Sequence, residues 1–419
     1  MKNPTGAEKM KQKLSSNIFL FLCISSLVAC GGGSDGVEVE CPDGNAGENW
    51  VWTGEVCSLR RDGFNWSVSS LAPALDGSDD LYTVGSFTHF KNQPIKHIAR
   101  INNDGSLDTG FYPKTSFFSP QVVALANDGS GDVYIGGYLS YNGPTSPIRG
   151  IARLNLDGSV DAGFNTGAGI GRKVRTIVPA TDGSGDVYVG GPSHSHTGAT
   201  FENGPIRLNS DGSLDTDFTS SFRGGEKSIA LAADGSGDIY VSRSSAPHIA
   251  RLNNDGSIDT DFDTGPSGFD RSVRNIAVAT DGSGDIYVAG SFTEYNGINT
   301  AGLARLNSDG SFDSGFVVDT SIFRHQGQGF ILPAVDGSGD VYVDVANSRS
   351  EGVIRLNDDG SVDTGFNIGE GFSANASLSD AAFTTDGSGD LYVAGDFSDY
   401  DSTPVVMLMR LTSDGVLVR

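Results

Sequence analysis

After residue 58 the chain alternates short apolar runs with short polar runs that are rich in Asp and Gly. The segment 281–316, DGSGDIYVAGSFTEYNGINTAGLARLNSDGSFDSGF, is a typical copy of this pattern. Its apolar runs have the length and the Val, Ile, Leu, Tyr and Phe content of β-strands, and Asp-Gly is favoured in hairpin turns. The pattern therefore predicts antiparallel strands joined by tight turns, and no helical periodicity is visible beyond residue 29.

Two signatures alternate along this region. The first is Asp-Gly-Ser-Gly-Asp followed by an aliphatic residue and Tyr, and it begins at Asp76 (as DGSDD), Asp128, Asp182, Asp234, Asp281, Asp336 and Asp386. The second is Arg-Leu-Asn-x-Asp-Gly-Ser, and it begins at Arg100 (as RIN), Arg153, Arg207, Arg251, Arg305, Arg355 and, in a clipped form, Arg410. The chain therefore contains seven repeats of about 52 residues, each long enough for four short strands.

Repeats of this length predict an all-β fold, a seven-bladed β-propeller that spans residues 59–419, with strands A to D in each blade. The last copy stops at RLTSDGVLVR and lacks the final Phe-bearing strand of the others. The segment 59–66, LRRDGFNW, resembles that missing end, with Phe64 matching Phe164 and Phe366. We therefore expect this N-terminal strand to pair with the last blade and close the ring.

The two alternating signatures resemble the delta-60 repeats of bacterial proteins. The resemblance covers about six sevenths of the chain. It implies a β-propeller fold, and it transfers no catalytic residue.

The first 29 residues have the features of a bacterial lipoprotein signal peptide. Four lysines precede the apolar run 18–29, which is too short to remain a membrane-spanning helix. The run ends in Leu-Val-Ala-Cys, which resembles a lipobox and implies that Cys30 is lipidated and anchors the protein in a membrane. A flexible tether, residues 30–37, follows. By the same resemblance, Gly31 after the cysteine implies the outer membrane of the cell envelope. A plain secretory leader, a start at Met10 and either side of the membrane remain open.

Residues 38–58 hold the two cysteines that remain in the mature chain. An oxidising compartment favours a disulfide between Cys41 and Cys57. The alternating stretch around Trp50 and Trp52 is compatible with a small hairpin. We interpret this segment as a disulfide-stapled cap or spacer.

The formal net charge of −24 makes nucleic acid an unfavourable partner, because it repels a phosphate backbone. We expect a soluble monomeric ring whose charge serves solubility. The signature arginines stand beside apolar residues in every copy. We expect them to be structural, with a carboxylate such as Asp259 as the partner of Arg251.

The two signatures are both turns of the A-to-B and C-to-D kind, so they lie at the same end of the blades, here called the signature face. The B-to-C and D-to-A connections form the opposite face, here called the loop face. Arg and aromatic residues, which binding surfaces favour, gather in these connections, Arg175 among them. The candidate binding residues on the loop face are Phe90, Tyr141, Arg172, Lys173, His194, His196, Arg223, Arg271, Tyr295, Arg324 and Tyr400.

Two groups of residues raise the question of a metal. Asn307, Asp309 and Asp313 offer closely spaced oxygens to calcium, although their spacing differs from that of an EF-hand and Asp-Gly is also ordinary turn chemistry. His194 and His196 interrupt the repeat and could bind a transition metal, but no third ligand is visible in the sequence. We commit to no cofactor.

The sequence contains no nucleophile elbow, no phosphate loop and no cysteine–histidine pair typical of a catalytic site. A non-catalytic scaffold that binds a protein or glycan through the loop face is therefore the first hypothesis. The alternative is a carbohydrate-active lyase or hydrolase with its site on the same face, because such sites can be assembled from single residues of several blades.

Overall fold

A computed structural model describes residues 49–52, 57–60, 63–113, 119–142, 147–167, 169–170, 173–191, 194–196, 199–201, 204–222, 228–243, 245–300, 302–319, 329–346, 351–372 and 376–418. The chain divides into two units, Met1–Arg61 and Asp62–Arg419. In the first unit, β1 (Asn49–Trp52) pairs with β2 (Cys57–Arg60) in an antiparallel hairpin. The hairpin expected around Trp50 and Trp52 is therefore present. Cys41 lies outside the described residues, so the expected disulfide remains a prediction.

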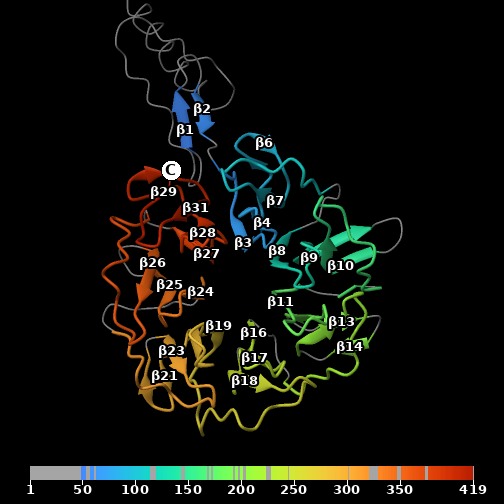
Figure 1. Ribbon diagram of the computed structural model, residues 1–419, viewed down its shortest axis with the longest axis vertical. Coiled ribbons are helices and arrows are strands. Elements are labelled where there is room, and N and C mark those ends of the chain that lie inside the picture. The colour runs from blue at the N-terminus through green and yellow to red at the C-terminus, as the bar shows by residue number, and fades with distance from the viewer. Residues whose placement is uncertain are drawn as a thin grey trace, which may run out of the picture. The chain divides into compact units, whose positions relative to one another are not determined.

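The second unit contains one three-stranded antiparallel sheet per repeat, with strands A, B and C in that order. In Figure 1 these sheets follow one another around a ring, with the A strands toward its middle. The described residues of this unit form strands and turns and contain no helix. The seven sheets are β3 (Val68–Pro73), β4 (Leu81–Gly85) and β7 (Ile98–Ile101); β8 (Pro120–Leu125), β9 (Val133–Asn142) and β10 (Pro147–Leu154); β11 (Thr176–Pro179), β12 (Val187–Gly190) and β15 (Ile206–Leu208); β16 (Ile229–Leu231), β17 (Ile239–Ser242) and β18 (Ile249–Leu252); β19 (Val273–Val278), β20 (Ile286–Gly290) and β23 (Leu303–Leu306); β24 (Ile331–Pro333), β25 (Val341–Ala346) and β26 (Glu351–Leu356); and β27 (Ser377–Phe383), β28 (Leu391–Asp396) and β31 (Leu408–Leu411).

The B-to-C connections of four repeats carry an additional two-stranded hairpin. These hairpins are β5 (His89–Phe90) with β6 (Gln93–Pro94), β13 (His194–His196) with β14 (Ala199–Phe201), β21 (Glu294–Tyr295) with β22 (Ile298–Asn299), and β29 (Asp399–Tyr400) with β30 (Thr403–Pro404).

The middle strand of each sheet is the most deeply buried one. In β20 all five residues are buried, because neighbouring sheets cover both of its faces. A strand covered on both sides carries a nearly continuous apolar run, which explains why an aliphatic residue and Tyr follow each first signature. The Tyr of this strand packs edge-on against the Phe that ends the same repeat, as Tyr287 does with Phe316 at 5.4 Å between ring centres. Both rings belong to a cluster that includes Val341 and Val343 of the following repeat, so adjacent repeats share one core.

The predicted fourth strand is much shorter than expected. In its place each repeat has a single bridge across the second signature turn, such as Leu306 with Phe312. The reason is that the chain does not continue along its own sheet after this turn. It crosses to the following repeat, where the backbone N–H of Val317 donates to the carbonyl oxygen of Asp359 at 2.9 Å. The equivalent crossing bonds are Tyr112 to Asp157, Asn165 to Asp211, Thr219 to Asp255, Asp263 to Asp309 and Asn367 to Asp414.

The crossing places the chain directly on the glycine of the next second-signature turn. Gly310 has a φ of 89°, and a Cβ built there would lie 2.8 Å from the carbonyl oxygen of Asp263. Glycine is therefore required at this position both by the backbone conformation and by the close approach of another chain segment.

Side chains near the start of strand A join neighbouring A strands. Five such hydrogen bonds are formed among the described residues: Leu71 N–H to Asp380 Oδ2 at 2.8 Å, Ser379 Oγ to the Val68 carbonyl at 2.6 Å, Val123 N–H to Ser70 Oγ at 3.4 Å, Ile276 N–H to Ser228 Oγ at 3.2 Å, and Asn275 Nδ2 to the Gly329 carbonyl at 2.5 Å. These hydrogen bonds join the start of one A strand to the start of the next. The residues that make them are here called the inner belt.

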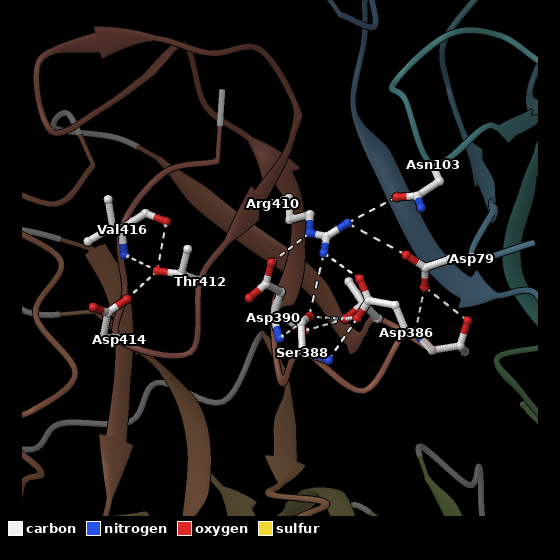
Figure 2. Close-up of polar contacts among 11 residues, drawn as sticks. Asp79, Asn103, Asp386, Ser388, Asp390, Arg410, Thr412, Asp414 and Val416 are labelled. Carbon is white, nitrogen blue, oxygen red and sulfur yellow. Dashed lines mark hydrogen bonds and ion pairs between the residues drawn. The ribbon is translucent and has the colours of Figure 1, made fainter.

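The first and seventh repeats are also in contact (Figure 2). Arg410 of the last repeat reaches Asp79 at 3.5 Å and Asn103 at 3.1 Å, both in the first repeat. Asp79 Oδ1 accepts hydrogen bonds from the backbone N–H and the hydroxyl of Thr385 at 2.6 and 2.9 Å. Asp79 is the residue that departs from the first signature, since Gly stands at this position in the other six copies. It keeps the left-handed backbone of that glycine, with a φ of 60°, and is buried.

The described residues of the N-terminal segment form no strand pairing with the last repeat, so the pairing that the sequence suggested is not confirmed. β2 pairs with β1, and Phe64 forms a bridge with Phe90 of the first repeat. Phe64 corresponds to Phe269 and Phe372, which bridge Tyr295 and Tyr400 in the same way, and not to the Phe that ends a repeat. A short aromatic motif matches both positions, and only the packing distinguishes them.

Gly310→Ala tests the crossing. We expect a loss of stability of about 3 kcal/mol, because strain from the positive φ adds to a clash with the crossing backbone. Gly282→Ala is the matched control: its φ is 84°, but a Cβ there meets nothing within 4 Å. It should cost only the strain, about 1 kcal/mol. Urea denaturation midpoints measure both, and equal losses would contradict the role of the crossing.

Candidate functional site

The signature arginines form a network of ion pairs inside the signature face. Arg305 Nε donates to Asp313 Oδ2 at 2.5 Å, and its Nη1 pairs with Asp358 of the following repeat. Its guanidinium also lies over the ring of Phe316, 5.3 Å from the ring centre. Arg251 pairs with Asp259, so the predicted partner is confirmed. These arginines are structural.

Three of the arginines pair mainly with aspartates of the first signature instead of the second. Arg100, Arg153 and Arg410 donate mainly to aspartates of the first signature, as in the bonds of Arg410 to Asp390 at 2.8 Å and Asp386 at 2.7 Å (Figure 2). Hydrogen bonds from Ser388, with weaker ones from Thr384 and Arg410, lower the pKa of Asp386 against the effect of burial. Burial alone would lower the pKa of Arg410, but its carboxylate partners raise it. Both groups therefore stay charged near neutral pH.

The calcium candidates are part of the same turn chemistry. Asn307 Nδ2 donates to Ser311 Oγ at 2.8 Å, and Asp309 Oδ1 accepts the N–H of Ser311 at 2.9 Å. Asp313 pairs with Arg305. Within the described ranges, no three or more His, Cys, Asp or Glu residues are grouped so that they could hold a metal ion. Asp309 Oδ1 and Asp313 Oδ2 thus accept hydrogen bonds from protein donors here.

Three of the aromatic candidates on the loop face are core residues. Phe90, Tyr295 and Tyr400 are each at most 4% exposed. Phe90 packs against Phe64 with ring centres 4.7 Å apart, and Tyr295 and Tyr400 donate their hydroxyls to the carbonyls of Gly310 and Gly415 at 2.5 and 2.6 Å. The short loop-face hairpins fold back and bury these rings, so they offer no binding surface.

Several candidates cannot be placed. Arg172, Arg223, Arg324, Cys30 and Cys41 lie outside the described residues. Tyr141, His194, His196 and Cys57 lie on described strands, but only their backbone is described. The metal reading of His194 and His196 thus remains a prediction.

Two cationic candidates are accessible. The side chain of Arg271 is 64% exposed and lies 3.6 Å from Asp270. Lys173 is half-buried, and its Nζ lies 5.3 Å from the ring centre of Tyr138. Arg175, two residues further on, is exposed.

Sequence reasoning missed two exposed aromatic residues on the loop face. Trp66 is 61% exposed and Tyr138 is 54% exposed. The sequence did not identify Trp66 because its segment was aligned with the end of a repeat. Trp66 instead stands ten residues before the first signature, in the same place as Arg271 in the fifth repeat. Tyr138 follows Gly136 and Gly137 in β9, and the preceding glycine pair is the signal that could have drawn attention to it. The accessible candidate site is therefore the start of the A strands with the adjoining end of β9.

The family of the chain follows from these repeats. A model described as "Domain of unknown function (DUF5122) beta-propeller" matches residues 79–111, 127–164, 183–218, 232–262, 282–316, 335–366 and 383–417. The chain therefore belongs to this family of β-propeller repeats, which is the delta-60 type that the signatures resemble. The all-β, seven-repeat prediction is confirmed.

Comparison with curated proteins gives no match. Among solved structures, the chain is similar to "Dihydro-heme d1 dehydrogenase NirN in complex with DHE", with 12% identity and a TM-score of 0.46. The match covers 84% of this chain and 66% of that one. Similarity at this level transfers no activity. No helix in the described parts of the chain is long and apolar enough to cross a membrane.

A partly accessible carboxylate, Asp380, lies in the inner belt. Burial raises the pKa of Asp380 to about 6, against the hydrogen bonds from Leu71, Ser70 and Ala381 that favour the charged form. Because the folded protein holds this proton more tightly than the unfolded chain, stability should fall as pH rises from about 4 through about 6.

Asp380→Asn tests this account. The variant keeps an acceptor oxygen but cannot ionise, so it should not lose the corresponding stability. Between pH 4 and pH 7 the wild type should lose about 1 to 2 kcal/mol more than the variant, a value reduced for partial solvent access. Urea denaturation across this range measures the difference, and parallel pH profiles would show that Asp380 carries no such cost.

Proposed function

We propose that the protein is a lipid-anchored binding scaffold of the bacterial envelope or cell surface, without catalytic activity, that contacts its ligand through the loop face. The observation that carries the proposal is the contrast between the two faces. On the signature face, arginines and aspartates bind one another. On the loop face, Lys173 and Arg175 have no carboxylate within ion-pairing distance among the described residues, and Trp66 and Tyr138 are exposed. Exposed cationic and aromatic residues favour partner binding.

The anchor is proposed from the leader sequence. Residues 1–29 act as a lipoprotein signal peptide, Cys30 carries the lipid, and the outer membrane is the expected location. Residues 38–58, stapled by Cys41 and Cys57, separate the anchor from the ring. Closure of the ring is part of the same proposal, supported by the contacts of Asp79 with Thr385 and Arg410.

Cys30→Ala tests the anchor. We expect the variant to lose incorporation of radiolabelled fatty acid, because the thiol is the attachment point. Cys23→Ala, a change inside the leader, is the control and should be labelled like the wild type. Labelling that persists in Cys30→Ala would disprove the lipobox assignment.

The purified full-length protein in detergent tests scaffold against enzyme. It is titrated with neutral and acidic oligosaccharides and with envelope proteins, and the same mixtures are assayed for glycan cleavage. Saturable binding with an unchanged glycan supports the scaffold. Cleavage that one loop-face substitution abolishes supports the alternative, a propeller-type lyase or hydrolase. The absence of binding to any of these ligands would refute the proposal.

A further inference from the structure

The junction of the second and third repeats places two cations next to one buried residue, Val174. Val174 N–H donates to the Gly137 carbonyl at 3.2 Å, and Arg175 N–H donates to the Gly190 carbonyl at 2.9 Å. Val174 is fully buried between them. Lys173 and Arg175 flank Val174 in the chain, and Arg175 is close enough to Lys173 to act on its charge.

A glycine pair brings the aromatic ring to these cations. A Cβ on Gly136 would lie 2.7 Å from Cγ1 of Val174, and one on Gly137 would lie 2.5 Å from the carbonyl oxygen of Ser119. The absence of a side chain at Gly136 lets β9 approach the start of the third repeat closely, and its absence at Gly137 lets β9 approach Ser119 of its own repeat. Tyr138 is thereby held beside Lys173 while half of its surface stays open.

Among the described residues, no carboxylate forms an ion pair with this cluster. The chain has 52 acidic and 28 basic residues, yet neither Lys173 nor Arg175 pairs with a carboxylate in the part of the chain that the structure describes. The signature arginines and Arg271 do have such partners. Burial, together with repulsion from Arg175, lowers the pKa of Lys173. A bound anion would relieve that repulsion.

We propose that Lys173, Arg175 and Tyr138 form a subsite for an acidic sugar, with the sugar carboxylate between the two cations and a C–H face of the ring against Tyr138. The proposal deepens the binding function above and rests on it. Arg175 supplies a planar fork that matches a carboxylate, and Lys173 adds a point charge. The open ring of Tyr138 favours a sugar over an acidic peptide, because a uronic acid offers an apolar face and a carboxylate on one ring.

Calorimetric titration of the full-length protein with a tri-galacturonate tests the subsite. The fully methyl-esterified trisaccharide is the matched ligand, since it keeps the sugar rings and lacks the charges. We expect saturable binding of the acid and at least tenfold weaker binding of the ester. Equal binding of the two ligands would overturn the proposal.

Lys173→Gln and Arg175→Gln should each weaken binding of the acid roughly tenfold, the loss of one charged contact. Tyr138→Leu should weaken binding of the sugar without affecting binding of free acetate. Lys96→Gln is the control: it removes an exposed cation from a B-to-C connection of the same face and should leave the affinity unchanged. Thermal melting checks that each variant is folded.

The outcomes separate the two proposals. If Lys173→Gln and Arg175→Gln leave the affinity for the sugar unchanged, the subsite proposal is wrong and the scaffold proposal still stands. If the wild-type protein does not bind this sugar but does bind another ligand through the loop face, the subsite proposal is again wrong and the scaffold proposal stands. If a short poly-glutamate peptide binds more tightly than the sugar, the two cations bind an acidic peptide and the proposal of an acidic sugar is wrong. Failure to bind any ligand refutes both proposals.

Discussion

The structure depends on the crossing of the chain from each repeat onto the second signature turn of the next. One backbone hydrogen bond, such as Val317 to Asp359, marks every crossing, and a glycine with positive φ lies beneath it. The Phe that ends a repeat is carried into a core shared with the following repeat. No repeat can therefore complete its core alone, which is the property that makes repeat proteins cooperative between neighbours.

At the junction of the first and last repeats, the described residues form no crossing bond of this kind. Side chains take its place. Asp79 stands where other copies have Gly, and it receives two hydrogen bonds from Thr385 and the charge of Arg410. An aspartate in left-handed backbone costs some strain, which these contacts offset. Asp79, the one residue that departs from the first signature, thus lies at the junction of the first and last repeats, which is held by side-chain contacts.

These requirements separate the two faces of the ring. Carboxylates and arginines of the signatures satisfy one another, so their number reflects architecture. The residues of the loop face are not required for this ion pairing, and they vary between copies. The acidic chain repels anions at long range, but salt screens charges beyond about 8 Å, so a local pair such as Lys173 and Arg175 can still attract an anion. Lys173 also lies beside the exposed ring of Tyr138, which adds an aromatic surface to this charge.

The sequence by itself determined the all-β repeat architecture, the place of each turn and the structural role of arginines such as Arg251, because these depend on local turn chemistry that recurs seven times. Tertiary structure alone decided which loop-face residues are accessible. Phe90, Tyr295 and Tyr400 are buried because short hairpins fold back onto the sheets, whereas Tyr138 is exposed at the end of β9, just after Gly136, which lets β9 approach Val174 of the next repeat. It also decided that the second signature leads into a neighbouring repeat instead of a fourth strand. Such contacts join residues far apart in the chain, and no local pattern records them.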